Sequence, residues 1–254
     1  MRAEYFKILG IRITATNIHE CKTLINNAIN GKINQYIVIR DVHGIVQSHK
    51  SQAVKAAHDH AAYVLPDGMP LVWIGKIKGN KSIDRCYGPD LMLAIMDESV
   101  EKGYKHFFYG GNSGVANRLK SEMENRYPGV KIVGTYSPPF RPLNKSEELE
   151  LENLIDELKP DILWIGLSTP KQELFMYENL NKLNAKLMIG VGAAFDFHTG
   201  IIKQAPALVQ RLGFEWAYRI FQEPRRLWKR YLISIPTFIV YYILELLKLK
   251  NFNR

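Results

Sequence analysis

The alternation of short apolar runs with helix-like segments constrains the fold of this chain more than any other feature. Three apolar runs, residues 105–109, 161–166 and 186–191, end in glycine or in a Gly-rich turn and lack strict polar–apolar alternation. Such continuous runs are typical of strands covered on both faces of a sheet. The helix-like segments are 51–65, 88–103, 113–129, 145–160 and 171–183. Strands that alternate with helices predict parallel βαβ units, so we expect an α/β fold with a parallel sheet flanked by helices.

Local signals set several of the expected boundaries. Residues 36–44, "YIVIRDVHG", begin as a β-branched strand and then become polar, whereas "AAYVLP" is a helix or a short strand that ends at Pro66. We expect Ser146 to cap the helix over 145–160, with Pro160 as its stop. Ligands bind beyond the carboxyl ends of parallel strands, so the residues after each apolar run are the first candidates for a site.

The length and composition allow one sizeable domain with an appendage. The chain has 254 residues, of which 46% are hydrophobic, so a packed core is expected. Its two cysteines, Cys21 and Cys86, require no disulfide and fit a reducing compartment. The first residues lack the apolar segment of a secretory signal, so we expect none. We place the main α/β domain at 1–204 and a basic, amphipathic appendage at 205–254.

The net charge of +9 is concentrated in this appendage. Ten of the 34 Lys and Arg residues, but only three of the 25 Asp and Glu residues, lie from residue 203 onward. Five basic residues are interleaved with Trp and Tyr: Arg219, Arg225, Arg226, Lys229 and Arg230. This mixture suits a membrane interface and predicts an anionic partner.

The appendage also contains an apolar run over 231–247. The run holds Pro236 and Glu245 and is shorter than the roughly 20 apolar residues that a spanning helix needs. We therefore expect helices that lie on the inner leaflet, which makes the chain a peripheral membrane protein. A core helix with a solvated basic face is the structural alternative. We expect no nucleic acid as a partner, because the apolar residues exceed what a phosphate groove needs.

Three Gly-rich turns are candidate ligand sites. Gly110, Gly111 and Asn112 lie between a strand and a helix, where free backbone N–H groups favour phosphate, although a tight turn explains them equally well. In "WIGLSTPKQELF", Gly166, Ser168 and Gln172 could hold a sugar or nucleotide. An ordinary helix cap is the favoured alternative there.

The third turn is "GVGAAFDFHTG", where Gly190 and Gly192 permit close approach of a ligand. Asp196 and His198 follow it, but in an extended segment they would point to opposite sides, so local backbone bonding is favoured for Asp196. The histidines and acids form no metal-binding motif, so we expect no metal and assign charge compensation to Arg, Lys and helix dipoles.

One carboxylate stands apart from these turns. Asp67 lies in "LPDGMPLVW", between prolines and apolar residues. Asp-Gly is a common turn dipeptide, so a purely structural role is one interpretation. The other is a base at the rim of an apolar pocket, where desolvation would raise its pKa.

Seven segments occur in a characteristic order: "YIVIRDVHGIV", "VLPDGMPLVW", "RCYGPDLM", "FFYGGNSGVANRLKSEMENRYPGVKIVGTYSPPF", "PDILWIGLSTPKQELF", "GVGAAFDFHTG" and "QAPALVQRLGFEWAYRIFQEPRRLWKRYL". Each is weak alone. Together, from about residue 8 to about residue 240, they resemble the WecG/TagA/CpsF glycosyltransferase family.

This resemblance implies a Rossmann-like α/β domain with a C-terminal membrane-associating appendage, often in a homo-oligomer. It implies transfer of a sugar from a UDP-sugar to a polyprenyl-diphosphate-linked saccharide acceptor at the cytoplasmic face of the membrane. The anomeric centre would be inverted, without a cofactor or a metal. Teichoic acid, common antigen and capsule assembly are the typical settings.

The resemblance also assigns roles to residues. Asp67 corresponds to the catalytic base, and Gln172 to the active-site glutamine of a "P-x-Q-E" segment. Arg219 and Arg226, with their neighbours Arg225 and Arg230, match arginines that reach a diphosphate. UDP is expected over Gly110–Asn112 and Gly190–Gly192.

The stretch containing Arg40, Asp41 and His43 should line the site. Teichoic-acid members have "T-x-N-x-E" there, whereas this chain has the "D-V-H-G" form, which is nearer the capsule and exopolysaccharide branch. The sugar stays open between N-acetylmannosamine, glucose, another N-acetylhexosamine and a uronic acid. Two rival classes are a nucleotide-dependent oxidoreductase, which would lack the G-x-G-x-x-G fingerprint, and a non-catalytic membrane-recruited nucleotide-binding module.

Overall fold

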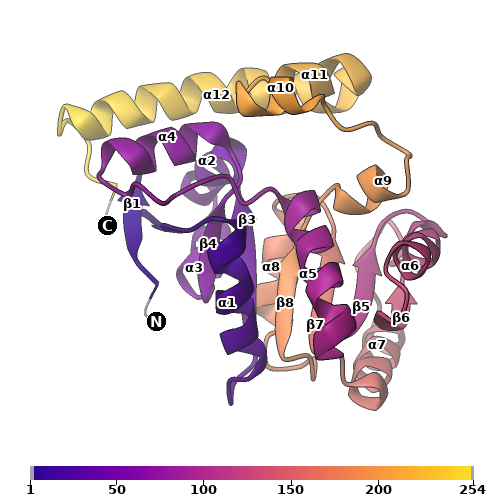
Figure 1. Ribbon diagram of the computed structural model, residues 1–254. Helices are drawn as coiled ribbons and strands as arrows, with labels where there is room; N and C mark the ends of the chain where they lie inside the picture. Colours follow the sequence, from indigo (N-terminus) through magenta and orange to yellow (C-terminus); the bar gives the residue numbers. More distant parts are fainter. Residues whose placement is uncertain (1–2, 253–254) are drawn as a thin grey trace.

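A six-stranded parallel sheet forms the centre of the computed structural model, which describes residues 3–252 (Figure 1). Its strands are β3 (Gln35–Arg40), β4 (Tyr63–Pro66), β5 (Lys105–Gly110), β6 (Lys131–Tyr136), β7 (Ile162–Gly166) and β8 (Leu187–Gly190). They lie in the order β4-β3-β8-β7-β5-β6, and every neighbouring pair is parallel. Phe107, Leu163 and Trp164 are fully buried. The α/β fold predicted from the apolar runs is confirmed.

Helices cover both faces of the sheet. One face carries α1 (Ile18–Ile29), α5 (Gly88–Lys102), α6 (Val115–Arg126) and α9 (Ala194–His198), whose apolar residues form one core cluster with the sheet. The other face carries α2 (Val42–Lys50), α3 (Gln52–Asp59), α7 (Lys145–Leu158) and α8 (Lys171–Asn179). Burial on both faces explains why the strands are apolar throughout rather than alternating.

The strands end together at one edge of the sheet. Gly110 pairs with Gly166 at the ends of β5 and β7, and Arg40 pairs with Pro66 at the ends of β3 and β4. Gly110 has φ +132°, and a Cβ atom there would lie 2.5 Å from the Gly166 carbonyl oxygen, so only glycine fits this crossing. The loops that follow the strands therefore converge on one side of the molecule.

A hairpin, a helix and the C-terminal segment complete the fold around the sheet. A hairpin of β1 (Tyr5–Ile8) and β2 (Ile11–Thr14) packs beside β4. Helix α4 (Met69–Ile77) contacts both β1 and β4. The C-terminal segment forms α10 (Ala207–Arg211), α11 (Glu215–Gln222) and α12 (Pro224–Leu246). In Figure 1, α12 lies across α2 and α4, with α10 and α11 beside it. Phe238 and Phe252 join the core cluster, so this segment is packed onto the main domain.

Three local expectations were wrong. Residues 51–65 are not one helix, because α3 ends at Asp59 and Tyr63–Pro66 pairs with β3 as β4. The segment with Asp196 and His198 is the short helix α9, not an extended chain. The cap of α7 is Asn144, whose side chain accepts from the Glu147 N–H in a capping box. Ser146 lies within the helix, because Asn144 and Glu147 satisfy the first turn reciprocally.

No helix within residues 3–252 has both the length and the hydropathy to cross a bilayer. α12 is long enough, but its charged and polar residues lower its mean hydropathy. The proposed division at residue 204 stays a prediction.

Candidate active site

A cavity of about 600 Å³ lies between the carboxyl edge of the sheet and the C-terminal helices. Loops after β3, β4, β7 and β8 form its floor, while α10, α11 and α12 supply its cover. Twelve of the predicted site residues line it: Asp41, His43, Asp67, Gly166, Ser168, Gln172, Gly190, Gly192, Asp196, Arg219, Arg226 and Arg230. The cavity therefore lies where ligands bind in parallel α/β sheets, beyond the carboxyl ends of the strands.

Asp67 is fixed by the strand pairing beneath it. Its backbone N–H donates to the carbonyl oxygen of Arg40 at 2.8 Å, so the turn after β4 is tied to the end of β3. The Asp67 carboxylate faces the cavity, and 26% of the side chain remains accessible. Asp67 is thus a turn residue by its backbone and a cavity residue by its carboxylate.

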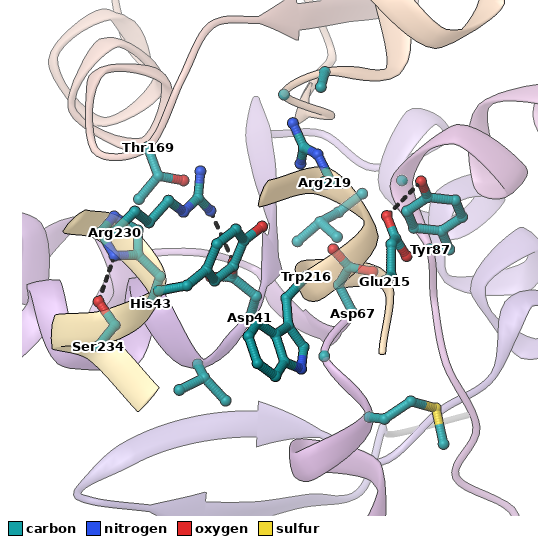
Figure 2. Close-up of a pocket in the computed structure, with 18 of the residues that line it drawn as sticks. Asp41, His43, Asp67, Tyr87, Thr169, Glu215, Trp216, Arg219, Arg230 and Ser234 are labelled. Atoms are coloured by element: carbon teal, nitrogen blue, oxygen red, sulfur yellow. Dashed lines mark hydrogen bonds and ion pairs between the residues drawn. The ribbon is translucent and has the colours of Figure 1, made fainter. Parts of the chain in front are cut away.

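Arg85 pairs with this carboxylate. Its Nη2 lies 3.0 Å from Asp67 Oδ1 and 2.5 Å from Glu215 Oε2, and its Nε donates to the Asp67 carbonyl oxygen at 2.6 Å. The Tyr87 hydroxyl donates to the other Glu215 oxygen at 2.8 Å. Glu215 begins α11, so this network ties the C-terminal segment to the turn that carries Asp67. Figure 2 shows the bond between Tyr87 and Glu215 near Asp67.

Burial raises the pKa of Asp67 to about 6. The nearby Arg85 guanidinium lowers this pKa, whereas the negative charges of Glu215 and Asp41 raise it further. A carboxyl group with a pKa near 6 is mostly ionised at neutral pH yet is a stronger base than an ordinary aspartate. This is the balance that a general base near pH 7 needs.

A second ion pair lies next to the turn that carries Asp67, because a Cβ atom at Gly68 would lie 3.4 Å from the Asp41 Cα. Arg230 Nη2 donates to Asp41 Oδ2 at 2.8 Å, and Asp41 Oδ1 caps α2 by accepting from the Gly44 N–H at 2.9 Å. Burial alone would raise the pKa of Asp41, but Arg230, His43 and the cap hold it well below its ordinary value. Asp41 is therefore ionised, and its two oxygens bind Gly44 of α2 and Arg230 of α12.

His43 makes a further contact with α12. Its Nδ1 lies 2.7 Å from the Ser234 hydroxyl oxygen, as Figure 2 shows. Burial, together with the positive charge of Arg230, lowers the pKa of His43 to about 4. The ring is neutral at pH 7, so it offers hydrogen bonding rather than charge to a ligand.

Arg40 lies beneath the cavity, not in its lining. It is fully buried and pairs through Nη2 with Glu173 Oε1 at 2.7 Å. Gly44 leaves the space for it, because a Cβ atom there would lie 1.6 Å from Arg40 Nη1. The prediction that Arg40 contacts substrate is corrected: no part of its side chain reaches the cavity surface, so it can act only through Glu173 and the residues around it.

Gln172 connects this buried pair to the cavity. Its Nε2 donates to Glu173 Oε1 at 3.0 Å, and its Oε1 accepts from the Gly192 N–H at 3.0 Å. A Cβ atom at Gly190 would lie 3.1 Å from the Gln172 amide, so glycine is needed beside it. Both ends of the amide are thus occupied by protein, and Gln172 holds the loop after β8 in place.

The arginines of the C-terminal segment retain unused donors. Arg219 and Arg226 share Glu223, at 3.4 Å and 2.6 Å. Buried Nε atoms of Arg219 and Arg230 have no hydrogen-bond partner within the described residues. Burial raises the pKa of Asp196, against the lowering effect of Arg226. Arg219, Arg226 and Arg230 line the cavity, so an anionic ligand there would meet their guanidinium groups.

Besides Arg40, four predicted residues lie outside the lining. Gly110 ends β5 beside Gly166, and Gly111 and Asn112 follow it, so these three residues border the cavity rather than form its wall. Arg225 is exposed at the start of α12. Their contacts with a donor or a lipid surface stay predictions.

Arg85, Tyr87 and Glu215 were not identified as site residues from sequence. A composition argument could have found Glu215, since the basic C-terminal segment has only three acidic residues. Each of them has a specific partner: Glu215 binds Arg85, Glu223 binds Arg219 and Arg226, and Glu245 accepts from the Leu9 N–H. No comparable signal marks Arg85.

Within residues 3–252, no three His, Cys, Asp or Glu side chains come together in a way that could hold a metal ion. The charged groups of the cavity are instead paired carboxylates and guanidinium groups.

Comparison with known proteins identifies the family. Residues 6–252 match the glycosyl transferase WecG/TagA/CpsF family, which covers nearly the whole chain. The chain belongs to this family.

Two curated relatives agree with this WecG/TagA/CpsF assignment. The chain is 29% identical over 194 residues to the N-acetylglucosaminyldiphosphoundecaprenol N-acetyl-beta-D-mannosaminyltransferase of Bacillus spizizenii, over 76% of this chain and 72% of the relative. It is 30% identical over 190 residues to the protein of the same name from Bacillus subtilis (strain 168), over 75% of this chain and 72% of the relative. The resemblance inferred from the seven segments is confirmed.

In this WecG/TagA/CpsF chain, a carboxylate and several guanidinium groups share one cavity. Asp67 is a partly accessible carboxylate with a raised pKa, and Arg219, Arg226 and Arg230 line the cavity from α11 and α12. A carboxylate with a raised pKa can accept a proton, and guanidinium groups can offset negative charge.

Proposed function

We propose that this protein transfers a hexose from a UDP-sugar to a polyprenyl-diphosphate-linked saccharide in the synthesis of a cell-surface polymer. N-acetylmannosamine is the first candidate sugar, because both curated relatives are named for its transfer. Glucose or a related hexose is the alternative, since the chain has the "D-V-H-G" form at 41–44. The observation that carries the proposal is a cavity with Asp67 on one wall and three arginines, Arg219, Arg226 and Arg230, on another.

Asp67 acts as the general base in this proposal. The acceptor hydroxyl gives its proton to the Asp67 carboxylate while its oxygen bonds to the anomeric carbon of the donor. The bond from that carbon to the UDP oxygen breaks, and UDP leaves with the bonding pair. Attack from the face opposite UDP inverts the anomeric centre. Arg85 holds the carboxylate in position and lowers its pKa, against the effect of burial.

Arginine side chains offset the negative charge of the phosphates without a metal ion. The positions of Arg219, Arg226 and Arg230 in the cavity lining support this role, because guanidinium groups bind phosphate. The loop over Gly190–Gly192, held by Gln172, and the turn at Gly166–Ser168 present backbone groups on the donor side. UDP would lie over these strand ends and extend towards Gly110–Asn112.

The C-terminal segment places the enzyme on the inner face of the cytoplasmic membrane. Its outward side has large exposed apolar residues next to basic ones. They are Phe221, Trp228, Leu232, Ile233, Val240 and Ile243, with Arg225 and Lys229. Apolar residues enter the interface while basic residues attract anionic headgroups. A homo-oligomer stays a prediction.

The proposal is tested by incubating the full chain with individual UDP-sugars and a lipid-diphosphate-linked N-acetylglucosamine, with and without EDTA. We expect UDP and glycosylated lipid in equal amounts with one UDP-sugar, and the same rate in EDTA. UDP release without glycosylated lipid would contradict transfer. Loss of turnover in EDTA that magnesium restores would contradict the metal-independent mechanism.

A further inference from the structure

One part of the cavity has no role in the chemistry proposed above. It is an apolar channel, here called the apolar arm, between α4, the turn from α10 to α11, and α12. The side chains that form it are Met69, Pro70, Trp73, Leu212, Phe214, Ile235, Phe238 and Ile239.

Close packing between α4 and the α10–α11 turn forms one wall of the apolar arm. Gly213 has φ +77°, and a Cβ atom there would lie 3.1 Å from the Trp73 ring and 3.3 Å from Met69 Cβ. The backbone of Gly213 therefore lies directly against α4. This contact holds the neighbouring Leu212 and Phe214 beside Trp73 without filling the space in front of them.

Several side chains of the apolar arm are accessible although they are large and apolar, whereas Phe238 is buried. Trp73 is 48% exposed, Leu212 is 54% exposed and Ile239 is 51% exposed. Single exposed apolar residues are common on protein surfaces, but several that line one concave wall are typical of a site for an apolar ligand.

The apolar arm is continuous with the outward face of α12. Tyr231, Ile235 and Phe238 face the cavity, and Leu232 and Ile243 are exposed on the outward side. Ile239 belongs to both sets, since it lines the cavity and is half-exposed. Residues four apart lie on the same side of a helix, so Ile235, Ile239 and Ile243 form a row from the cavity to the outward face.

The opposite end of the cavity is cationic. Arg219, Arg226 and Arg230 line it, and Arg219 and Arg230 have unpartnered buried donors. A ligand that matches both ends has a phosphate group joined to an apolar chain. The outward apolar face of α12 gives that chain a path to a bilayer without exposure to water.

We propose that the apolar arm binds the first isoprene units of the lipid carrier, next to the diphosphate. This inference rests on the proposed function for the identity of the lipid, and it adds a binding site for the chain itself. The subsite makes the enzyme prefer acceptors whose chain begins with branched isoprene units, and it orients the diphosphate towards the arginines.

Direct binding measures the subsite without any transfer reaction. The full chain, without detergent or vesicles, is titrated by calorimetry with isopentenyl diphosphate, which has one isoprene unit, and with farnesyl diphosphate, which has three. Each fully buried CH2 group lowers Kd by about fourfold. We expect farnesyl diphosphate to bind at least about tenfold more tightly than isopentenyl diphosphate. Equal Kd values would overturn the proposal.

A matched pair of variants tests where the chain binds. Ile239→Ser removes a residue of the apolar arm, whereas Ile243→Ser removes the same residue type one turn later, outside the cavity, at 48% exposure. We expect Ile239→Ser to reduce the Kd ratio between the two diphosphates by about tenfold, and Ile243→Ser to leave that ratio as in the parent. Leu212→Ser is the second test and should act like Ile239→Ser.

All three substituted side chains are half-exposed, and melting temperatures verify that the variants fold. A Kd ratio that is unchanged in Ile239→Ser and in Leu212→Ser would overturn the proposal, because the chain would then bind elsewhere. Chain-dependent binding together with no glycosyl transfer to any acceptor would refute the proposed function and leave the subsite in place.

Discussion

Replacing Asp67 with Asn separates catalysis from stability at one position. The carboxylate is the proposed general base, and such a base contributes about 10²–10⁴-fold to the rate. We therefore expect Asp67→Asn to lower kcat by about this factor. The amide keeps the size of the side chain and, like the aspartate, leaves the backbone bond from residue 67 to Arg40 intact.

The same substitution should stabilise the fold. Burial raises the pKa of Asp67 from 3.8 to about 6, so the folded state binds this proton more tightly than the unfolded state. The stabilising contribution of the protonated group is complete below pH 4 and is lost as the pH rises to about 6. At pH 7 the ionised carboxylate costs up to about 3 kcal/mol, because each pKa unit corresponds to about 1.4 kcal/mol.

We expect Asp67→Asn to increase the free energy of unfolding at pH 7 by about 1–3 kcal/mol, with about 2–4 °C in Tm per kcal/mol. The loss of the ion pair between residue 67 and Arg85, which has two carboxylate partners, offsets part of this gain and sets the lower end of the range. The gain should shrink between pH 6 and pH 4. Urea unfolding at several pH values and steady-state kinetics on the same preparations measure both effects.

Asp59→Asn is the matched control. Asp59 ends α3 and pairs with Lys55 on the surface, away from the cavity, so both rate and stability should stay near those of the parent. A rate within a few-fold of the parent for Asp67→Asn would return Asp67 to a purely structural role. A loss of stability that is independent of pH would refute the argument from desolvation.

The remaining predictions concern the groups around Asp67 and the outward face of α12. Arg85→Met removes the cation that lowers the pKa of Asp67, so the acidic limb of the kcat/KM profile should move above pH 6; an unmoved limb in a pH series would contradict this. Arg40→Met leaves the Glu173 carboxylate buried without its partner and should cost about 3–5 kcal/mol in urea unfolding, whereas a neutral effect would show that the pair is dispensable. Leu232→Ser combined with Val240→Ser removes two exposed apolar residues outside the cavity, so affinity for vesicles with anionic lipids should fall by at least tenfold, with Tm unchanged. Undiminished vesicle binding would place the membrane contact elsewhere.

The sequence by itself determined the fold class and the edge of the sheet at which the site lies. Apolar strands end in Gly166 and Gly190, and these ends converge whenever parallel strands share one sheet. This information is local and periodic, so a single chain reveals it. The residues around Asp67 left both a turn and a base open, and the role of a base was assigned by the family resemblance.

Tertiary structure alone decided which charged groups meet. Asp41 and Arg230 are 189 residues apart, and Arg85 and Glu215 are 130 apart. No period or motif links such positions, and their pairing depends on how the C-terminal segment packs on the sheet edge. The same packing forms the apolar arm and the closed side of the cavity.

The structure also distinguishes two neighbouring residues that were both expected to line the site. Arg40 and Asp41 are adjacent in sequence, yet Arg40 is buried against Glu173 while Asp41 lines the cavity. The reason is the end of β3: successive side chains of a strand point to opposite faces, and the chain then enters α2, where Gly44 makes room for the guanidinium group. The family resemblance predicted that both residues would line the site, and only burial distinguished between them.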